Sequence, residues 1–299
     1  ADFVADESRF TGPGVNMSKA LQKDVETMLA ERAQERPLSA VHSLKSLQRS
    51  DSVHFLSMDT TKLAQMITLV DSELYSKIRP WELLRTAWSQ KKYYYRSVNV
   101  IHLIQRLNRF TIWVAALIVW PTSLKQRVEV MEKLLRIGKL LLQYNNYHSL
   151  MGIYAAFEIS AVARLKHTFA GVKKKLRAFL DETRALFDQS SSWKNYREAF
   201  KAVGPPAVPY LGISLTDLVY IEDGNKTLLE DGRINFTKQK LVAKVIKSVL
   251  QYQSPAHEFS ISPVEYTFTR EFSFMAETPL YSLSLKREPR DCSVKDIES

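Results

Sequence analysis

The chain has 299 residues, 45% of them hydrophobic and 25% charged, and this length can bury a substantial core in one large domain or two small ones. Only 9 glycines are present, about half the usual share, so phosphate-cradling glycine loops are disfavoured and helices are favoured. A single cysteine, Cys292, excludes an internal disulfide framework and fits the reducing environment of the cytoplasm.

The formal net charge is +10, and two basic runs, Val172–Arg177 and Gln90–Arg96, are compatible with nucleic-acid binding. No recognised nucleic-acid motif accompanies these runs. The alternative is a solvated basic surface near anionic lipid or an acidic partner. We therefore expect no nucleic-acid partner, and a peripheral contact with an anionic membrane stays open.

The first fifty residues differ from the rest. Met17–Gln34 has the pattern of one amphipathic helix, and Pro37 disfavours a helix through the residue before it. We expect residues 1–50 to form an N-terminal arm or linker remnant. Helical periodicity dominates from about Asp51, and the apolar run Phe110–Trp120, too short to span a bilayer, predicts a core helix.

Residues 123–144 predict an amphipathic helix. Apolar residues recur at spacings of three, four and seven, at Val128, Met131, Leu135 and Leu142. Two acid-before-base pairs four residues apart are expected on the opposite face, Glu129 with Lys133 and Glu132 with Arg136.

Tyr210–Asn225 is a further predicted helix, mostly apolar until Glu222 and Asp223 at its end. Two interpretations are open: a buried helix that ends at Gly224–Asn225, or a helix whose end projects from the protein. Residues 234–253 predict a partner helix with one apolar face, and Lys238, Lys240, Lys244 and Lys247 are expected off that face. The turn signal Asp231–Gly232 lies between them, so the two predict a helical hairpin. Val264–Phe274 alternates apolar and polar residues and predicts a strand.

Motifs for covalent chemistry are absent from the sequence. There is no H-E-x-x-H, no G-x-x-x-x-G-K-[ST] and no G-x-S-x-G, and the six histidines are scattered. We expect no metal site, no cofactor and no covalent enzyme, and a helical interaction protein is the leading interpretation.

Four long segments resemble the catalytic domain of Ras-family guanine-nucleotide exchange factors of the Son of sevenless type. They are Ile67–Leu84, Asn145–Phe169, Val208–Asn225 and Gly232–Ile246, and Leu280–Arg290 resembles the end of that domain. The resemblance implies an all-α helical bowl with a protruding helical hairpin, formed by residues 51–290, with 291–299 as a C-terminal tail. Fifty upstream residues are too few for the second helical domain that the family usually carries, so we expect a fragment or a compact member.

The resemblance also implies a mechanism without covalent chemistry. The first hairpin helix would enter a small GTPase and displace the switch segment that covers the nucleotide. Val219 matches the apolar residue of this wedge and Asp223 its acidic residue, and a spacing of four places them on one helical face. The alternatives are core packing for Val219 and a helix-end turn acid for Asp223.

An apolar pocket for an aromatic side chain of the GTPase is implied at Ile104, Met151, Trp193 and Tyr210, although each alone would more often belong to a core. The family's contacts also fall on Tyr220, Glu222, Asn225 and Glu158. Some relatives have Asn at the position of Glu158, so this residue could alter which GTPase is accepted.

The implied partner is a Ras-subfamily GTPase of the Ras, Rap or Ral type, bound most tightly when free of nucleotide. We expect a monomeric, cytoplasmic protein recruited to membranes where its GTPase is anchored. The rival interpretation is a related domain that binds a GTPase or a scaffold without exchanging nucleotide.

Overall fold

The computed structural model describes residues 55–260 and 277–298, and within these ranges its regular structure is helical. The α-helices are α4 (Thr60–Ser76), α5 (Val98–Val119), α6 (Leu124–Gln143), α7 (Tyr147–Glu158), α8 (Ser160–Ala163), α9 (Lys166–Gly171), α10 (Lys174–Leu186), α11 (Ser190–Lys201), α12 (Leu211–Gly224), α13 (Phe236–Leu250), α15 (Glu277–Arg287) and α16 (Val294–Glu298). Three 3-10 helices, η2 (Pro80–Leu83), η3 (Ala87–Ser89) and η4 (Lys91–Arg96), connect α4 to α5. The predicted helix at residues 17–34 and the predicted strand at 264–274 lie outside the described residues.

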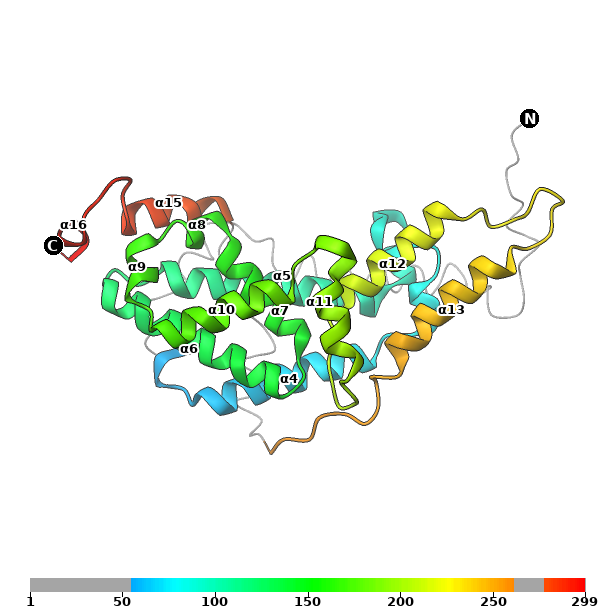
Figure 1. Cartoon of the computed structure of the whole chain (residues 1–299), viewed down its shortest axis with the longest axis horizontal. Helices are drawn as coiled ribbons and strands as arrows, with labels where there is room; N and C mark the ends of the chain where they lie inside the picture. The colour runs from blue at the N-terminus through cyan, green and yellow to red at the C-terminus, as the bar shows by residue number, and fades with distance from the viewer. Residues whose placement is uncertain (1–54, 261–276, 299) are drawn as a thin grey trace.

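The body of the molecule is built around α5, which packs against α4, α6, α7, α8 and α15 (Figure 1). Its second half, from Phe110 to Val119, is buried except at Thr111 and Ile112, so the predicted core helix is confirmed. Ring contacts of Trp113 with Phe55 and Phe110 add aromatic packing to this core. Across residues 55–260 and 277–298, no helix combines the length and the apolar character that crossing a membrane requires.

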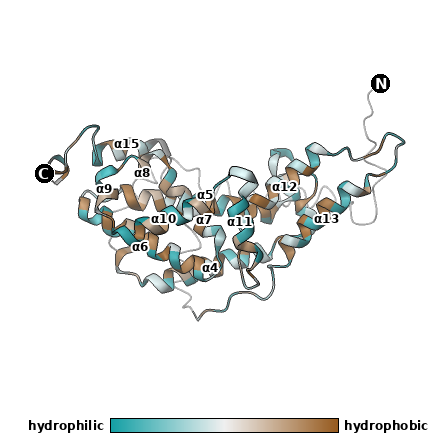
Figure 2. Ribbon diagram, in the orientation of Figure 1, coloured by the Kyte–Doolittle hydropathy of each residue, from teal (hydrophilic) through white to brown (hydrophobic). Residues whose placement is uncertain are grey.

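Helix α6 is amphipathic, as predicted, and carries both hydrophilic and hydrophobic residues in Figure 2. The Glu132–Arg136 pair is confirmed at 2.7 Å, but its predicted place opposite the apolar stripe is wrong for Glu132, which is buried and also pairs with Lys173 at 3.1 Å. The prediction for Lys133 is wrong: this side chain is buried, and its Nζ donates to the carbonyl oxygens of Phe55 at 2.6 Å and Leu56 at 3.0 Å. Five helices surround α6, so little of its circumference faces solvent. Burial lowers the pKa of Lys133.

The two predicted hairpin helices, α12 and α13, pack against each other and extend together away from the body, joined at their far end (Figure 1). Their base has a core of its own. It joins residues of α12 and α13 to residues of α4, η2, η3 and the first half of α5: Leu211, Leu215, Leu218, Val242, Val249, Tyr75, Ile78, Leu83, Trp88, Val100, Ile101 and Leu103, with Val208 before α12. We call this set the hairpin core.

Hydrogen bonds also fix the base of the hairpin. The Tyr75 hydroxyl donates to the carbonyl oxygen of Val249 at 3.2 Å. Beyond α13, the Gln253 amide donates to the carbonyl oxygens of Tyr75 at 3.0 Å and Ile78 at 2.8 Å. The end of α13 is therefore tied to the end of α4, far from the tip.

Helix α15 is fastened to the opposite end of the body. Glu288, just after it, accepts hydrogen bonds from the backbone amide and the hydroxyl of Thr168, at 2.9 and 2.5 Å, and lies 3.7 Å from the buried guanidinium of Arg127. Arg164 donates to the carbonyl oxygen of Ser284 at 2.8 Å. These contacts hold α15 against α8 and α9.

Candidate functional site

Helix α12 leaves the protein core partway along its length. Its buried residues, Leu211, Ile213, Leu215 and Leu218, all lie before Val219. Beyond that point no residue of the helix is buried, and Tyr220 is 70% exposed. Such exposure of a large aromatic side chain marks a surface suited to contact with another molecule.

The predicted wedge residues straddle this boundary. Val219 is half-buried and packs against the hairpin core, whereas Asp223, one helical turn further on, is exposed. Both belong to the same helical face by their spacing of four. The arrangement presents an apolar side chain at the edge of the core, followed by a free-standing carboxylate.

Glu222 is tied to the partner helix. Its carboxylate lies 2.5 Å from Nζ of Lys238 on α13, and the same ammonium donates to the Thr227 hydroxyl at 3.0 Å. The prediction that Lys238 stands off the apolar face is wrong, because its side chain is only 3% exposed. The spacing could have predicted this burial, because Lys238 precedes the buried Val242 by four residues and so lies on the same face of α13.

Asn225 ends α12. Its side-chain amide donates to the carbonyl oxygen of Ile221 at 3.0 Å, satisfying one of the last helical carbonyls. The loop that follows returns to α13, and Leu229 N–H donates to the carbonyl oxygen of Arg233 at 2.7 Å. The tip of the hairpin is thus closed by polar contacts.

An aromatic cluster lies at the beginning of α12, around its N-cap residue Tyr210. The Tyr210 ring contacts Trp193 with ring centroids 5.9 Å apart, and Phe187 and His148 at 6.5 Å each. Its backbone amide donates to the Tyr196 hydroxyl at 3.0 Å. Burial raises the pKa of Tyr210 and, more strongly, that of Tyr196.

The structure brings two of the four predicted pocket residues into direct contact, Trp193 and Tyr210. Met151 is buried on α7, one turn beyond His148, which touches the Tyr210 ring. Ile104 is half-buried on α5, the neighbour of α7, and packs against the hairpin core. The four residues therefore come from helices that meet near the base of the hairpin.

Trp193 belongs to an unusual backbone turn. Ser191, Ser192 and Trp193 have φ values of 51°, 57° and 62°, in the left-handed region that costs roughly 1–2 kcal/mol for each L-residue. Arg197 donates to the Ser192 carbonyl oxygen at 2.7 Å and forms a two-pronged ion pair with Asp217 of α12, at 2.7 and 3.0 Å. Sequence reasoning missed this link, because no spacing rule joins residues 197 and 217.

A buried polar network lies behind the aromatic cluster. Asp71 accepts from Arg106 at 2.6 Å, from Asn146 at 2.8 Å and from the Ser149 hydroxyl. His148 is buried beside this network, and its desolvation lowers its pKa. The network joins α4, α5 and α7 by charge-assisted hydrogen bonds that require all partners to be present.

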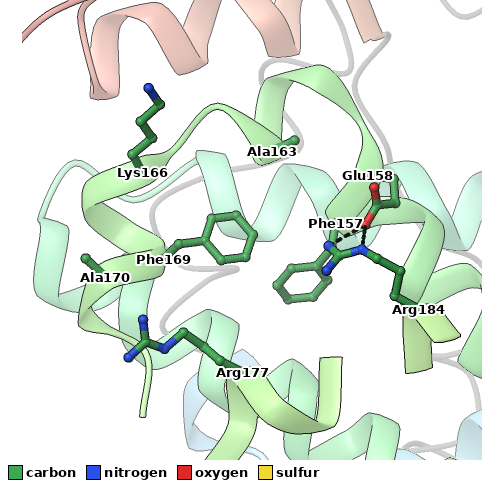
Figure 3. A pocket seen from close by; sticks show the side chains of 8 residues that line it. All are labelled: Phe157, Glu158, Ala163, Lys166, Phe169, Ala170, Arg177 and Arg184. Atoms are coloured by element: carbon green, nitrogen blue, oxygen red, sulfur yellow. Dashed lines mark hydrogen bonds and ion pairs between the residues drawn. The ribbon is translucent and has the colours of Figure 1, made fainter. Parts of the chain in front are cut away.

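Glu158 lies at the end of α7, away from the hairpin. Its carboxylate accepts from Nη2 of Arg184 at 2.8 Å and from Nε at 3.1 Å. The pair forms one wall of a cavity of about 420 Å³, into which the rings of Phe157 and Phe169 point (Figure 3). The remaining lining residues are Ala163, Lys166, Ala170 and Arg177. Glu158 thus stands at the edge of an apolar depression with a charged rim.

A metal centre is not evident in the part of the chain that the structure describes. There, no three His, Cys, Asp or Glu side chains come together as ligands. What the described residues do offer is a helical body with an exposed, anchored hairpin and an aromatic cluster at its base. These features define a protein-docking domain.

Comparison with known proteins agrees with this class. The RasGEF domain family matches residues 62–240. The chain is 34% identical to Ras guanine nucleotide exchange factor R of Dictyostelium discoideum over 283 residues, covering 91% of this chain and 16% of that protein. It is 32% identical to factor K of the same organism, covering 91% and 18%, and 30% identical to protein son of sevenless of Drosophila melanogaster, covering 81% and 16%.

The chain therefore belongs to the RasGEF family. Members of this family are nucleotide exchange factors, which act without making or breaking covalent bonds. The chain spans less than a fifth of the length of these three relatives.

Proposed function

We propose that this chain is a guanine-nucleotide exchange domain that binds a Ras-subfamily small GTPase, opens its nucleotide site with α12 and promotes release of GDP so that GTP can bind. The observation that carries the proposal is the hairpin itself. Its base is held in a separate core, while the end of α12 is exposed and carries Tyr220 and Asp223. Because the base of α12 is packed in the hairpin core, its exposed end can insert into a partner protein while that core stays folded.

In the proposed mechanism, the end of α12 acts on the part of the GTPase that holds Mg²⁺ and the phosphates. Val219 would bring an apolar side chain near the metal position, where it offers Mg²⁺ no oxygen ligand. The Asp223 carboxylate would occupy hydrogen-bond donors that otherwise serve the metal and phosphates. Because the domain binds the nucleotide-free GTPase best, linkage requires it to weaken nucleotide binding by the same factor.

Docking is proposed to rest on the cluster at the base of α12. Ile104, Met151, Trp193 and Tyr210 would form an apolar seat for an aromatic side chain of the GTPase, and a buried aromatic anchor typically dominates the energy of an interface. Trp193 and Tyr210 are both half-buried and in ring contact, so they offer aromatic surface without being lost in the core.

Further contacts are proposed near the end of α12, at Tyr220, Glu222 and Asn225. Glu222 and Asn225 would contact the GTPase while keeping their own partners, Lys238 and the carbonyl oxygen of Ile221. Glu158 is proposed as a selective contact, because its pairing with Arg184 would have to adapt to a charged residue of the GTPase.

The proposed exchange domain comprises residues 51–290 and adopts a helical bowl with a protruding hairpin, flanked by an arm at 1–50 and a tail at 291–299. It would act as a monomer in the cytoplasm, on a GTPase of the Ras, Rap or Ral type, and reach membranes where that GTPase is anchored. The net charge of +10 is compatible with peripheral contact with anionic lipid, and no nucleic-acid partner is expected for a member of this family.

The test is release of fluorescent GDP from a panel of purified Ras, Rap and Ral GTPases, with the chain added at catalytic concentration. Faster release from at least one GTPase is expected. If every GTPase binds without faster release, the chain is a docking or scaffold domain instead. If none binds, the proposed partner class is wrong.

A further inference from the structure

We propose that Gly212 is a positioning residue for binding. Because it has no Cβ, the Tyr210 ring can fold back over the first turn of α12, in the position that shapes the proposed apolar seat for the GTPase. This inference rests on the proposed function, because it assigns Tyr210 to the docking of the GTPase. A Cβ built on Gly212 would lie 2.4 Å from both Cζ and Oη of Tyr210, and 3.0 Å from Cε1. Side-chain atoms cannot approach so closely, so any residue larger than glycine displaces the ring.

The need for glycine comes from this ring and not from the backbone. Gly212 lies inside α12 with ordinary helical geometry, in contrast to Gly232 in the hairpin loop, whose φ is +81°. In a helix interior glycine is about 1 kcal/mol less favourable than alanine. The chain therefore carries a poor helix former in the first turn of α12, at a position where a Cβ would meet Tyr210.

Three other rings lie around the Tyr210 ring on its buried side. Trp193, Phe187 and His148 surround it, with centroids 5.9 to 6.5 Å away. The Tyr196 hydroxyl fixes the backbone amide of Tyr210 at 3.0 Å. A ring pushed off Gly212 cannot keep all these contacts, so it must turn outward and change the shape of the seat.

Stability and binding should respond differently to a Cβ at this position. The clashing atoms are the far end of a side chain that can rotate, so the backbone need not move. The Thr216 hydroxyl donates to the carbonyl oxygen of Gly212 at 2.9 Å, and a Cβ at residue 212 takes no part in this bond. Gly212→Ala should thus keep the fold, gain helix propensity and lose the preset position of Tyr210.

The experiment compares Gly212→Ala, Tyr210→Ala and the double variant for affinity toward a nucleotide-free GTPase that binds the unaltered chain. Gly204→Ala is the matched control, since a Cβ there meets nothing within 4 Å. We expect Gly212→Ala to weaken binding by about tenfold, with a melting temperature unchanged or slightly raised, and Gly204→Ala to leave binding unchanged. In the Tyr210→Ala background, Gly212→Ala should have no further effect, because the ring through which it acts is gone.

Two results would overturn the proposal. Additive losses in the double variant would mean that Gly212 acts independently of Tyr210, and a crystal structure of Gly212→Ala with the ring in its original place would remove the steric argument. A third result concerns the proposed function. If Tyr210→Ala binds normally while the ring is displaced in the Gly212→Ala crystal, the cluster is not a docking seat, and Gly212 has no role in binding.

Discussion

Replacing Asp223 by alanine tests whether the end of α12 acts on the open GTPase. Asp223 is exposed and lies beyond the hairpin core, so its removal leaves no cavity and should change the free energy of unfolding by less than about 0.5 kcal/mol. The lost contact with the GTPase would be a charge-assisted hydrogen bond of about 1.5–3 kcal/mol, made only when the nucleotide site is open. The maximal rate of GDP release should therefore fall by about one to two decades.

Stopped-flow release of fluorescent GDP at increasing concentrations of the domain separates the plateau rate from half-saturation. The expected result is a lower plateau with little change in half-saturation. Glu230→Ala, which removes an exposed carboxylate from the hairpin loop, is the control for net charge and should behave as the unaltered chain. An unchanged plateau in Asp223→Ala, with folding intact, refutes a role for the carboxylate and leaves steric opening by Val219.

Three further predictions concern the cluster and the network behind it. Tyr210→Ala should weaken the complex with the nucleotide-free GTPase by about 2 kcal/mol, more than it lowers the free energy of unfolding. Titration calorimetry measures the binding loss and thermal melting the stability loss; a larger stability loss with normal binding would contradict the prediction. Arg106→Ala should cost about 3–5 kcal/mol in urea denaturation, because Asp71 is left as a buried carboxylate without its cation; a loss below 1 kcal/mol would contradict this. Burial lowers the folded-state pKa of His148 below its unfolded value near 6.5, so the unfolded chain binds the proton more tightly and stability should decline as pH falls from about 6.5 toward that lower pKa. The loss of melting temperature over this window should be smaller in His148→Gln, and identical pH profiles would rule out His148 as its source.

Much of the helical architecture could be predicted from periodicity. The stripe of α6 and the apolar face of α13 follow from helical spacing, whereas the second half of α5 and α12 are predicted from mostly apolar runs. Lys133 could not be placed in this way, and for Lys238 the spacing to Val242 indicates the face but not the partner of its ammonium group. Each is a charged residue beside apolar ones, and whether it turns to solvent or to a buried acceptor depends on helices that lie elsewhere in the chain.

The candidate site was accessible to sequence reasoning only through the resemblance to exchange factors. That resemblance pointed to Val219, Asp223 and Tyr210, but not to the residues that hold them. The pair Arg197–Asp217, the left-handed turn before Trp193 and the fold-back of Tyr210 over Gly212 all depend on three-dimensional proximity. Periodicity describes the faces of a helix and contains no information about such contacts.

The base of the hairpin is packed in a core and the end of α12 is exposed, and this difference affects how the sequence of such a domain can change in evolution. Substitutions at exposed positions away from packing usually change stability by less than about 0.5 kcal/mol, whereas those in a core commonly cost several times more. Exposed residues at this end, such as Tyr220 and Asp223, can therefore vary with little threat to folding, while Leu211, Leu215 and Leu218 are constrained by the hairpin core. A new client preference could arise by mutation at the tip without a compensating mutation in the base, which makes the end of α12 the most evolvable part of this surface.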